Sequence, residues 1–374
     1  MTQASAKSVV VVGAGVTGLC AAWSLLDRDV SVTVVERDAV PSPRAASADH
    51  HRLIRHAYPS APGYGRRIPE AFAAWRAIWS RLGGDERRWY QPTQVLSASQ
   101  EADDNGDRAV ISMEQAGVDV ERLPPDELAR RFPHLETANL AYGALSPGGA
   151  LMASRIVTDI ADALRRRGAV VMDRSPVRSV SPSGEVRLHD GRALTADAVL
   201  LAAGTESPRL APAMFPDLFF CRTLVVYADP PEDLAEAWQG ASSWSSFGGD
   251  AYLWGIAPVD GLPPKLGAGS LRRIDDGDHD RRITPEEIQA MLSKYAGRFR
   301  GIDRFQLRWG QANYWTGAEN EEFQLRRDGR LWGLSADSGH GFKFGALTGE
   351  DVARALTGEA SFDSVRADLA GLAA

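Results

Sequence analysis

Cysteine is scarce in this chain, and its scarcity excludes a disulfide framework. Cys20 and Cys221 are the two cysteines among 374 residues, and they form no Cys-x-x-Cys pair. Two cysteines cannot staple a chain of this length into a loop-rich scaffold. Cys20 falls inside the first expected helix, where we interpret it as a small buried core residue.

Long apolar runs are missing as well. No run approaches the ~20 residues that are needed to span a bilayer. The short polar stretch at 1–8 lacks the charged-then-apolar pattern of a signal peptide. Together with the low cysteine content, this predicts a cytoplasmic protein that is not embedded in a membrane.

The chain has no excess of positive charge. Lysine and arginine number 42 against 49 aspartate and glutamate residues, for a formal net charge of −7. This balance argues against nucleic acid or an anionic membrane as a partner. The arginines instead gather in short clusters, such as Arg52 with Arg55 and Arg66 with Arg67. Local positive charge in an acidic protein suits a small anionic ligand.

Motifs for metal ions and for nucleophilic catalysis are absent too. Seven histidines occur, but no His-x-x-x-His or His-Glu-x-x-His pair is present. No G-x-S-x-G elbow marks a serine nucleophile. The acidic run 103–107 resembles part of a calcium loop, but the later ligands are missing, so we interpret it as a turn. We expect no metal site.

A dinucleotide motif is present near the N-terminus. Gly13, Gly15 and Gly18 follow an apolar strand at 9–12 and open a helix, and Glu36 ends the next strand. The first glycine permits a tight turn, the second lets a pyrophosphate approach the backbone, and the third lets the helix pack closely on the strand. The free N–H groups at the helix start favour phosphate. A glycine turn without a ligand is the alternative interpretation.

The second strand and the chain's later course favour FAD. Glu36 can accept hydrogen bonds from both ribose hydroxyls, and it would repel the 2′-phosphate of NADP despite the adjacent Arg37. The expected sheet is completed by the buried strand before Gly204 and again near the C-terminus. By analogy, such a discontinuous nucleotide domain is common in FAD-containing oxidoreductases.

The fold class that we expect is α/β combined with α+β. Apolar strands and helices of the Rossmann type predict an FAD-binding domain. Short runs of alternating polar and apolar residues predict a discontinuous antiparallel-sheet substrate domain, which would carry the catalysis. The FAD-binding domain is assigned to 1–85, 148–215 and 308–374, and the substrate domain to 86–147 and 216–307.

Three segments together resemble a known family. They are 13–36, the sequence RLIRHAY at 52–58 and the sequence SGHGFKF at 338–344. The chain resembles the D-amino acid oxidase superfamily of flavoproteins, and within it the monomeric sarcosine oxidase and N-methyltryptophan oxidase group. The spacing of the segments is also similar, so the resemblance covers nearly the full length.

The resemblance implies a catalytic role for Arg52, Lys265 and Lys343. Arg52 matches an arginine that lies over the flavin ring, and Lys265 matches a lysine at which oxygen is activated. Arg55 and Lys343 match the groups that hold the substrate carboxylate. The residues alone leave other interpretations open, because the arginines also fit a surface ion pair and the lysines also fit solvated loops.

The resemblance also implies the remaining site residues. Trp254 and Trp315 occupy positions where the family has tyrosines that wall the pocket, and Tyr58 is expected to bind substrate beside them; core packing is the alternative for both tryptophans. The residues expected to bind the cofactor are Gly13, Gly15, Val16, Thr17, Gly18, Glu36, Arg37, Arg52, Val177, Ala203, Gly204, Gly339, His340, Gly341, Phe342 and Lys343.

One departure from the family affects the cofactor. Related sarcosine oxidases attach FAD through a cysteine, and Asn313 stands at that position here. Neither Cys20 nor Cys221 matches it, so we expect non-covalent FAD. Loss of the thioether normally lowers the flavin potential, which weakens the case for a vigorous oxidase.

The expected reaction is oxidation of the C–N bond of a small carboxylated secondary or cyclic amine. A hydride passes to flavin N5, the product is an imine, and O2 yields hydrogen peroxide. The protein is expected to be a monomer. One alternative is an FAD-dependent dehydrogenase or desaturase in a biosynthetic pathway that does not use oxygen as its main acceptor. Another is a flavoprotein that binds FAD structurally or serves a larger complex.

Overall fold

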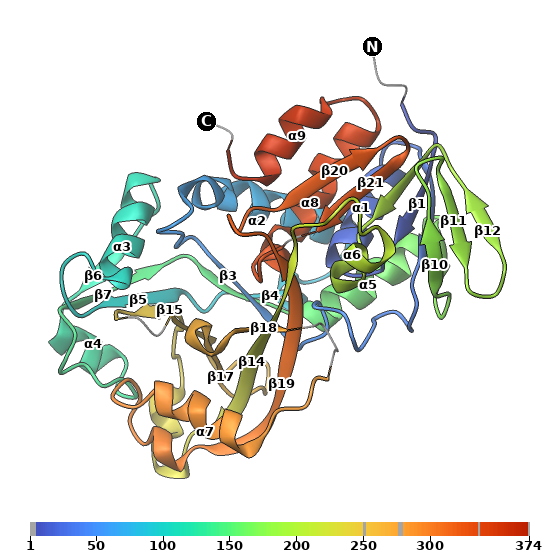
Figure 1. Ribbon diagram of the computed structural model, residues 1–374. Coiled ribbons are helices and arrows are strands. Elements are labelled where there is room, and N and C mark those ends of the chain that lie inside the picture. The colour runs from blue at the N-terminus through green and yellow to red at the C-terminus, as the bar shows by residue number, and fades with distance from the viewer. Residues whose placement is uncertain (1–4, 250–251, 276–279, 336, 373–374) are drawn as a thin grey trace.

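Two sheets dominate the computed structural model, which describes residues 5–249, 252–275, 280–335 and 337–372. A six-stranded, mostly parallel sheet lies beside a larger, mostly antiparallel sheet of nine strands (Figure 1). This combination confirms the expected fold class. The domain boundaries remain a proposal. The boundary expected between residues 307 and 308 falls within the long strand β19 (Gln306–Gly317) of the larger sheet.

The parallel sheet is built around its first strand. β1 (Ser8–Val12) pairs in parallel with β2 (Ser31–Val35) on one side and β13 (Ala198–Leu201) on the other. Because both faces of β1 are covered, its four valines are all buried. The remaining strands of the sheet are β9 (Val170–Met172), β21 (Leu331–Ser335) and the antiparallel edge strand β20 (Gln324–Asp328).

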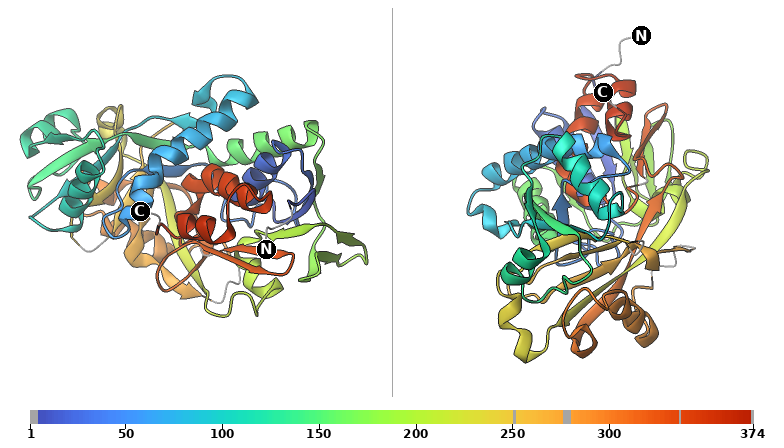
Figure 2. Two further views of the ribbon diagram at one scale, coloured as in Figure 1. Left: turned by 90° about the horizontal axis from the view of Figure 1, so that it is seen from above. Right: turned by 90° about the vertical axis from the view of Figure 1, so that its left-hand side faces the viewer.

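Helices from distant parts of the chain pack beside this sheet (Figure 2). A Cβ atom on Gly349 of α8 would lie 2.5 Å from the backbone of Cys20 in α1, so the two helices touch almost backbone to backbone. Cys20 is fully buried, as expected from the sequence. The helices of this part are α1 (Val16–Leu26), α2 (Pro62–Leu82), α5 (Ala153–Arg166), α6 (Ser207–Leu210), α8 (Gly341–Leu356) and α9 (Phe362–Leu369).

The larger sheet is organised by two long strands. β14 (Phe219–Asp229) and β19 run antiparallel side by side through the middle of the molecule (Figure 1). On its other edge β14 pairs with β17 (Lys265–Ala268) and β18 (Arg273–Asp275). The other elements of this part are β5 (Val95–Ser99), β6 (Glu121–Leu123), β7 (Tyr142–Ser146), β15 (Ser243–Phe247), β16 (Leu253–Ile256), α3 (Asn105–Gln115), α4 (Pro125–Arg131) and α7 (Pro285–Lys294).

Two small sheets complete the described strands. β3 (Arg52–Arg55) pairs with β8 (Gly148–Leu151), which also pairs with β4 (Tyr90–Gln91). The short strand β3 therefore carries Arg52 at one end and Arg55 at the other. A separate hairpin sheet contains β10 (Val177–Val180), β11 (Glu185–Leu188) and β12 (Ala193–Thr195).

The acidic run at 103–107 is not simply a turn, so that interpretation was wrong in part. The Asp104 carboxylate accepts a hydrogen bond of 2.8 Å from the backbone N–H of Asp107 and so caps α3. The acids serve the start of a helix. None of the helices in the described part combines the length and the apolar character that a membrane span requires.

Candidate active site

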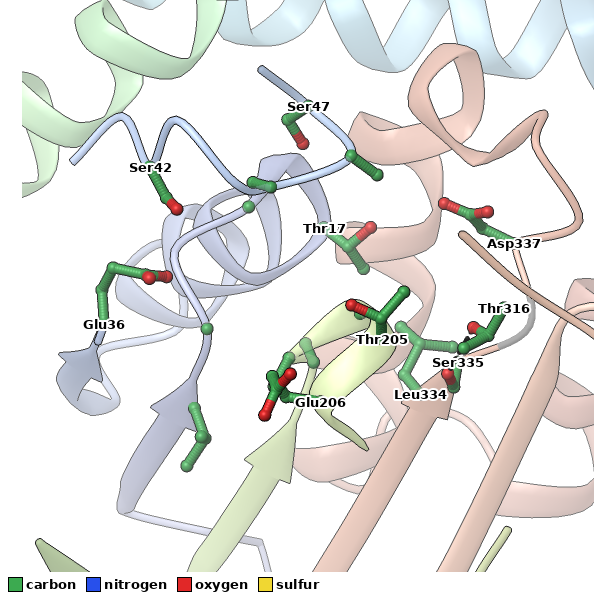
Figure 3. Close-up of a pocket in the computed structure, with 18 of the residues that line it drawn as sticks. Thr17, Glu36, Ser42, Ser47, Thr205, Glu206, Thr316, Leu334, Ser335 and Asp337 are labelled. Atoms are coloured by element: carbon green, nitrogen blue, oxygen red, sulfur yellow. Dashed lines mark hydrogen bonds between the residues drawn. The ribbon is translucent and has the colours of Figure 1, made fainter. Parts of the chain in front are cut away.

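A cavity of about 410 Å³ lies where β1, β13 and β21 end. Parallel strands present their carboxyl ends at the same edge of a sheet, where α/β folds bind ligands. Figure 3 shows Glu36 on one side of this cavity and Asp337 on the other, with Thr17 between them. The residues expected to bind the cofactor that line it are Gly13, Gly15, Val16, Thr17, Glu36, Arg37, Val177, Ala203, Gly204 and Gly341.

The glycine loop at this cavity has no room for side chains. Gly13 has φ of +107°, and a Cβ atom there would lie 2.5 Å from the carbonyl oxygen of Ala202. At Gly18 a Cβ atom would lie 2.0 Å from the carbonyl oxygen of Gly13. Gly18 lines neither cavity described here, and it acts by letting α1 approach the loop. The backbone is thus free to approach a phosphate at the start of α1.

Glu36 closes the far end of the loop. Its carboxylate accepts hydrogen bonds from the backbone N–H groups of Ala14 (2.9 Å) and Asp38 (3.1 Å). Burial raises its pKa, while these two N–H groups oppose the rise. Each carboxylate oxygen keeps a further lone pair, so acceptance from ribose hydroxyls stays open. Arg37 forms ion pairs with Glu206 (3.0 Å) and Asp38 (3.6 Å).

Sequence reasoning missed the segment that covers this loop. Ser42 and the residues 44–47 line the cavity, and the Ser47 hydroxyl accepts a 3.0 Å hydrogen bond from the N–H of Val16. No motif marks this segment, because its role depends on where it folds back over α1. Arg281 holds it by donating to the carbonyls of Arg44 (3.1 Å), Ala45 (2.6 Å) and Ala48 (3.1 Å).

A second cavity, of about 620 Å³, adjoins the first. The two share lining residues, among them Val16, Ser47 and Trp315, so together they form one elongated space. The glycine loop lies at one end of this space, and the wider second cavity, here called the chamber, lies at the other. The two ends fit the two halves of FAD. The predicted site residues that line the second cavity are Val16, Arg52, Arg55, Tyr58, Trp254, Lys265, Asn313, Trp315, Gly339, His340, Gly341, Phe342 and Lys343.

Arg55 and Lys343 bring two cations to this chamber. The Arg55 guanidinium lies 4.8 Å from the ring centroid of Tyr58, and the Lys343 ammonium lies 5.6 Å from it. Lys343 Nζ donates to the carbonyl of His340 at 3.1 Å. Within the described residues, neither cation forms an ion pair. Burial lowers the pKa of both groups, and the charge of Arg55 lowers the pKa of Lys343 further, while the charge of Asp337 opposes this shift.

Lys265 and Arg52 have a different setting, because they share a buried carboxylate. Lys265 is 0% exposed, which excludes a solvated loop lysine, and its Nζ donates to Asp49 Oδ2 at 2.6 Å and to the His51 carbonyl at 2.9 Å. Arg52 also donates to Asp49. The sequence analysis did not single out Asp49. Burial lowers the pKa of Lys265 to about 8, although the charge of Asp49 opposes the shift.

The aromatic residues line the chamber. Trp315 is 7% exposed, and its ring lies 3.1 Å from where a Cβ atom of Gly339 would stand. Trp254 covers Gly267 so closely that a Cβ atom there would lie 2.4 Å from the indole ring. The Tyr58 hydroxyl lies 3.3 Å from Nδ1 of His340. Both tryptophans therefore combine packing against backbone with a face on the cavity.

Asn313 is held by its neighbours on the cavity wall. Its side-chain oxygen accepts hydrogen bonds from Arg281 (3.3 Å) and Gln311 (3.1 Å). Cys20 and Cys221 are both buried, and neither lines the two cavities.

Comparison with known proteins agrees with this geometry. The sequence is 25% identical over 378 residues to monomeric sarcosine oxidase of Bacillus sp. (strain B-0618), covering 95% of this chain and 93% of that enzyme. It is 24% identical over 216 residues to N-methyl-L-tryptophan oxidase of Salmonella arizonae, which covers 55% of each protein. The crystal structure of L-proline dehydrogenase from P. horikoshii has a similar fold, with a TM-score of 0.81 at 16% identity over 97% of this chain and 96% of that one.

A family model fixes the assignment. The model described as DAO, FAD dependent oxidoreductase, matches residues 8–355, which is nearly the whole chain. The resemblance inferred from the three sequence segments is therefore confirmed, and an enzyme replaces the alternative of a structural flavoprotein. The chain belongs to the DAO family of FAD-dependent oxidoreductases, and it is an enzyme of the type that acts on the C–N bonds of amino acids.

Proposed function

We propose that the enzyme oxidises the C–N bond of a small secondary or cyclic amine that carries a carboxylate. One observation carries this proposal: Arg55 and Lys343 line the same chamber, and within the described residues neither forms an ion pair. The nearby Asp337 carboxylate acts on Lys343 without forming an ion pair with it, so two cations that are both at least half-buried still favour an anion between them. An amino acid-like substrate supplies that anion.

Each cation has its own task in positioning the substrate. The planar guanidinium of Arg55 can bind both oxygens of a carboxylate, whereas the Lys343 ammonium acts as a point charge. Fixing the carboxylate fixes the neighbouring carbon and its C–H bond, which lowers the entropic cost of reaction. The same positive charge disfavours a protonated amine. The substrate nitrogen is therefore held in the neutral form that hydride loss requires.

Bound FAD supplies the hydride acceptor, N5 of the flavin ring. The substrate carbon gives up a hydride and the nitrogen gives up its proton, so that a C=N bond forms, and water then converts the imine to a carbonyl compound and an amine. Trp254 and Trp315 offer apolar, aromatic walls to the rest of the substrate. A neutral amine or a ring fits such walls better than a strongly solvated side chain does.

We further propose that O2 is the electron acceptor. FAD held by the lining of the two cavities would, once reduced, supply two electrons and two protons to O2, which would leave as hydrogen peroxide. The buried ammonium of Lys265 beside the chamber supports this proposal, because a fixed cation stabilises the negative charge that oxygen acquires. The second candidate, a dehydrogenase or desaturase with another acceptor, is favoured by Asn313 at the position of the linking cysteine.

FAD is proposed to be bound without a covalent link through cysteine. Neither cysteine lines the cavities, and Asn313 is engaged by Arg281 and Gln311. Acid precipitation of the purified yellow protein should release the flavin into the supernatant. Colour that stays with the pellet would refute non-covalent binding.

The decisive experiment is anaerobic reduction of the purified holoenzyme. A panel of N-alkyl and cyclic amino acids should include compounds that bleach the flavin absorbance, whereas the matched amines without a carboxylate should not. Bleaching by the decarboxylated amines at equal rates would refute the proposed role of Arg55 and Lys343. Peroxide produced in air with the same substrate distinguishes the oxidase from the dehydrogenase, which would yield none.

The proposed partners follow from the same site. They are a small amine with a carboxylate and molecular oxygen, with no nucleic acid and no membrane, and we infer a cytoplasmic monomer.

A further inference from the structure

The buried carboxylate of Asp49 is the centre of a polar network beside the chamber. Its side chain is 1% exposed. It accepts hydrogen bonds from Lys265 Nζ (2.6 Å), from the Tyr227 hydroxyl (2.5 Å) and from Arg52. Its own carbonyl accepts a 2.7 Å hydrogen bond from Ser154, which fixes the backbone at this point. The network therefore ties the segment before β3 to strands β14 and β17.

The charges around Lys265 do not favour its protonated state without Asp49. Arg52 is a second cation, and its charge lowers the pKa of Lys265. His51 is 0% exposed, and neither of its ring nitrogens has a hydrogen-bond partner; burial lowers its pKa to about 3, so it is neutral. Tyr227 is a neutral phenol whose pKa burial raises far above its ordinary value. Among the described residues, Asp49 is the carboxylate that forms an ion pair with Lys265.

Burial makes this pairing decisive for the lysine. An ammonium removed from water loses its proton readily unless an opposite charge lies next to it. At 2.6 Å, Asp49 both supplies that charge and fixes the direction in which Nζ points. Arg281, the other cation near this segment, binds backbone carbonyls and Asn313, so it adds positive charge and no compensation.

We propose that Asp49 is a positioning residue that keeps Lys265 protonated and holds its ammonium beside the chamber for the reaction with oxygen. This inference rests on the role proposed for Lys265 above. It makes a distinct claim, because the lysine would act only as one member of a carboxylate–ammonium pair. Removal of the carboxylate should then slow the oxygen reaction as removal of the lysine does.

The test compares three neutralised variants of the holoenzyme. Asp49→Asn keeps the shape of the side chain and removes its charge. We expect reoxidation of the reduced flavin by O2 to slow at least tenfold at pH 7, to the level of Lys265→Met. The double variant should be no slower than either single variant, because both changes remove the same ammonium charge.

A second readout is independent of turnover. A nearby cation stabilises the extra negative charge of reduced FAD, so the midpoint potential of the bound FAD should fall in both Asp49→Asn and Lys265→Met. It should fall further in Lys265→Met, because that variant keeps the negative charge of Asp49. Two further variants separate charge from structure. Tyr227→Phe removes one hydrogen bond to Asp49 and keeps its charge, so it should change the rate less than threefold. Asp49→Glu should retain the wild-type potential.

Each outcome has a defined meaning. If Lys265→Met reoxidises at the wild-type rate, the oxygen role proposed for the lysine fails. If Lys265→Met is slow but Asp49→Asn keeps both the wild-type rate and the wild-type potential, the pairing inference alone fails. If Asp49→Asn does not bind FAD, the smaller neutral variant Asp49→Ser is measured in its place against the same two criteria.

Discussion

Arg55 and Lys343 reach one chamber from β3 and α8, which are almost 300 residues apart in the sequence. Neither forms an ion pair within the described part of the chain, in contrast to Arg52 and Lys265, which share Asp49. The chamber thus contains one pair of cations that shares a carboxylate and another pair that forms no ion pair among the described residues. The second pair, Arg55 and Lys343, is the one suited to an anionic substrate.

Replacement of Arg55 by methionine tests this distinction. Hydrogen bonds to charged groups contribute about 1.5–3 kcal/mol, so kcat/KM for a carboxylated amine should fall about 10- to 100-fold. Steady-state kinetics with the best substrate from the bleaching panel measures the loss. Arg272→Met serves as a control, because Arg272 also lines the cavity but forms an exposed ion pair with Glu321 (2.9 Å). Equal losses in the two variants would contradict the carboxylate role of Arg55.

The ionisation of Lys265 predicts a pH dependence for the oxygen reaction. Its pKa is lowered to about 8, chiefly by burial. The ammonium is therefore present below about pH 8 and lost above it, so reoxidation by O2 should be fast at neutral pH and slow as the pH rises through 8. Stopped-flow reoxidation between pH 6 and 10, on the order of ten points, measures the profile. Lys265→Met should give a flat one.

At the scale of elements, the turn between β1 and α1 is tightly constrained by packing. Gly13 and Gly168 both have positive φ, +107° and +95°. A Cβ atom at Gly13 would clash with the backbone of Ala202 at 2.5 Å, whereas nothing lies within 4 Å of one at Gly168. A side chain would strain the backbone at either position, but of the two positions Gly13 is the one where it would also clash with neighbouring backbone.

This pair allows a matched experiment on the cofactor loop. Gly168→Ala should lower the free energy of unfolding by about 1–2 kcal/mol and leave FAD binding intact. Gly13→Ala should lower it by a further 1–3 kcal/mol or so and weaken FAD binding. Urea unfolding and FAD titration of the apoprotein give the two quantities. Similar FAD affinity in both variants would show that the close approach to Ala202 is not needed.

Comparison of the observed elements with the sequence shows which local patterns predicted them correctly. The strand, glycine turn and acid of 9–36 are contiguous, so β1, α1, β2 and the place of Glu36 could be predicted from spacing alone. The run 103–107 was misread in part, because Asp, Asn and Gly favour both turns and helix caps, and the choice depends on the helix that follows.

At the scale of the whole molecule, contacts between residues far apart in the sequence determine the features of the site that the sequence alone could not show. Arg55, Lys343 and both tryptophans were found through a family resemblance and not through local physics. Asp49 was missed because its partner Lys265 lies 216 residues away, and no spacing rule connects a loop carboxylate to a strand on another sheet. Ser47 and Arg281 were missed for the same reason, since each acts on a segment that is distant in sequence.

The position of the cofactor groove predicts a strong link between FAD and stability. The groove is lined by residues from Val12 to Thr348, which come from the strand ends of the parallel sheet, the segment 42–47 and β19. A ligand that binds only the folded protein stabilises it by about 2.7 kcal/mol when its concentration is ~100 times Kd. The apoprotein should therefore melt several degrees below the holoenzyme and regain the difference on addition of FAD.

Limited proteolysis of the apoprotein should cut first within 42–49. Without the cofactor this segment loses its contacts with FAD and is held by Arg281 and by the hydrogen bond of Ser47. Riboflavin, which lacks the pyrophosphate and adenosine, should restore less of the melting temperature than FAD; equal restoration would contradict a binding site that extends along the glycine loop.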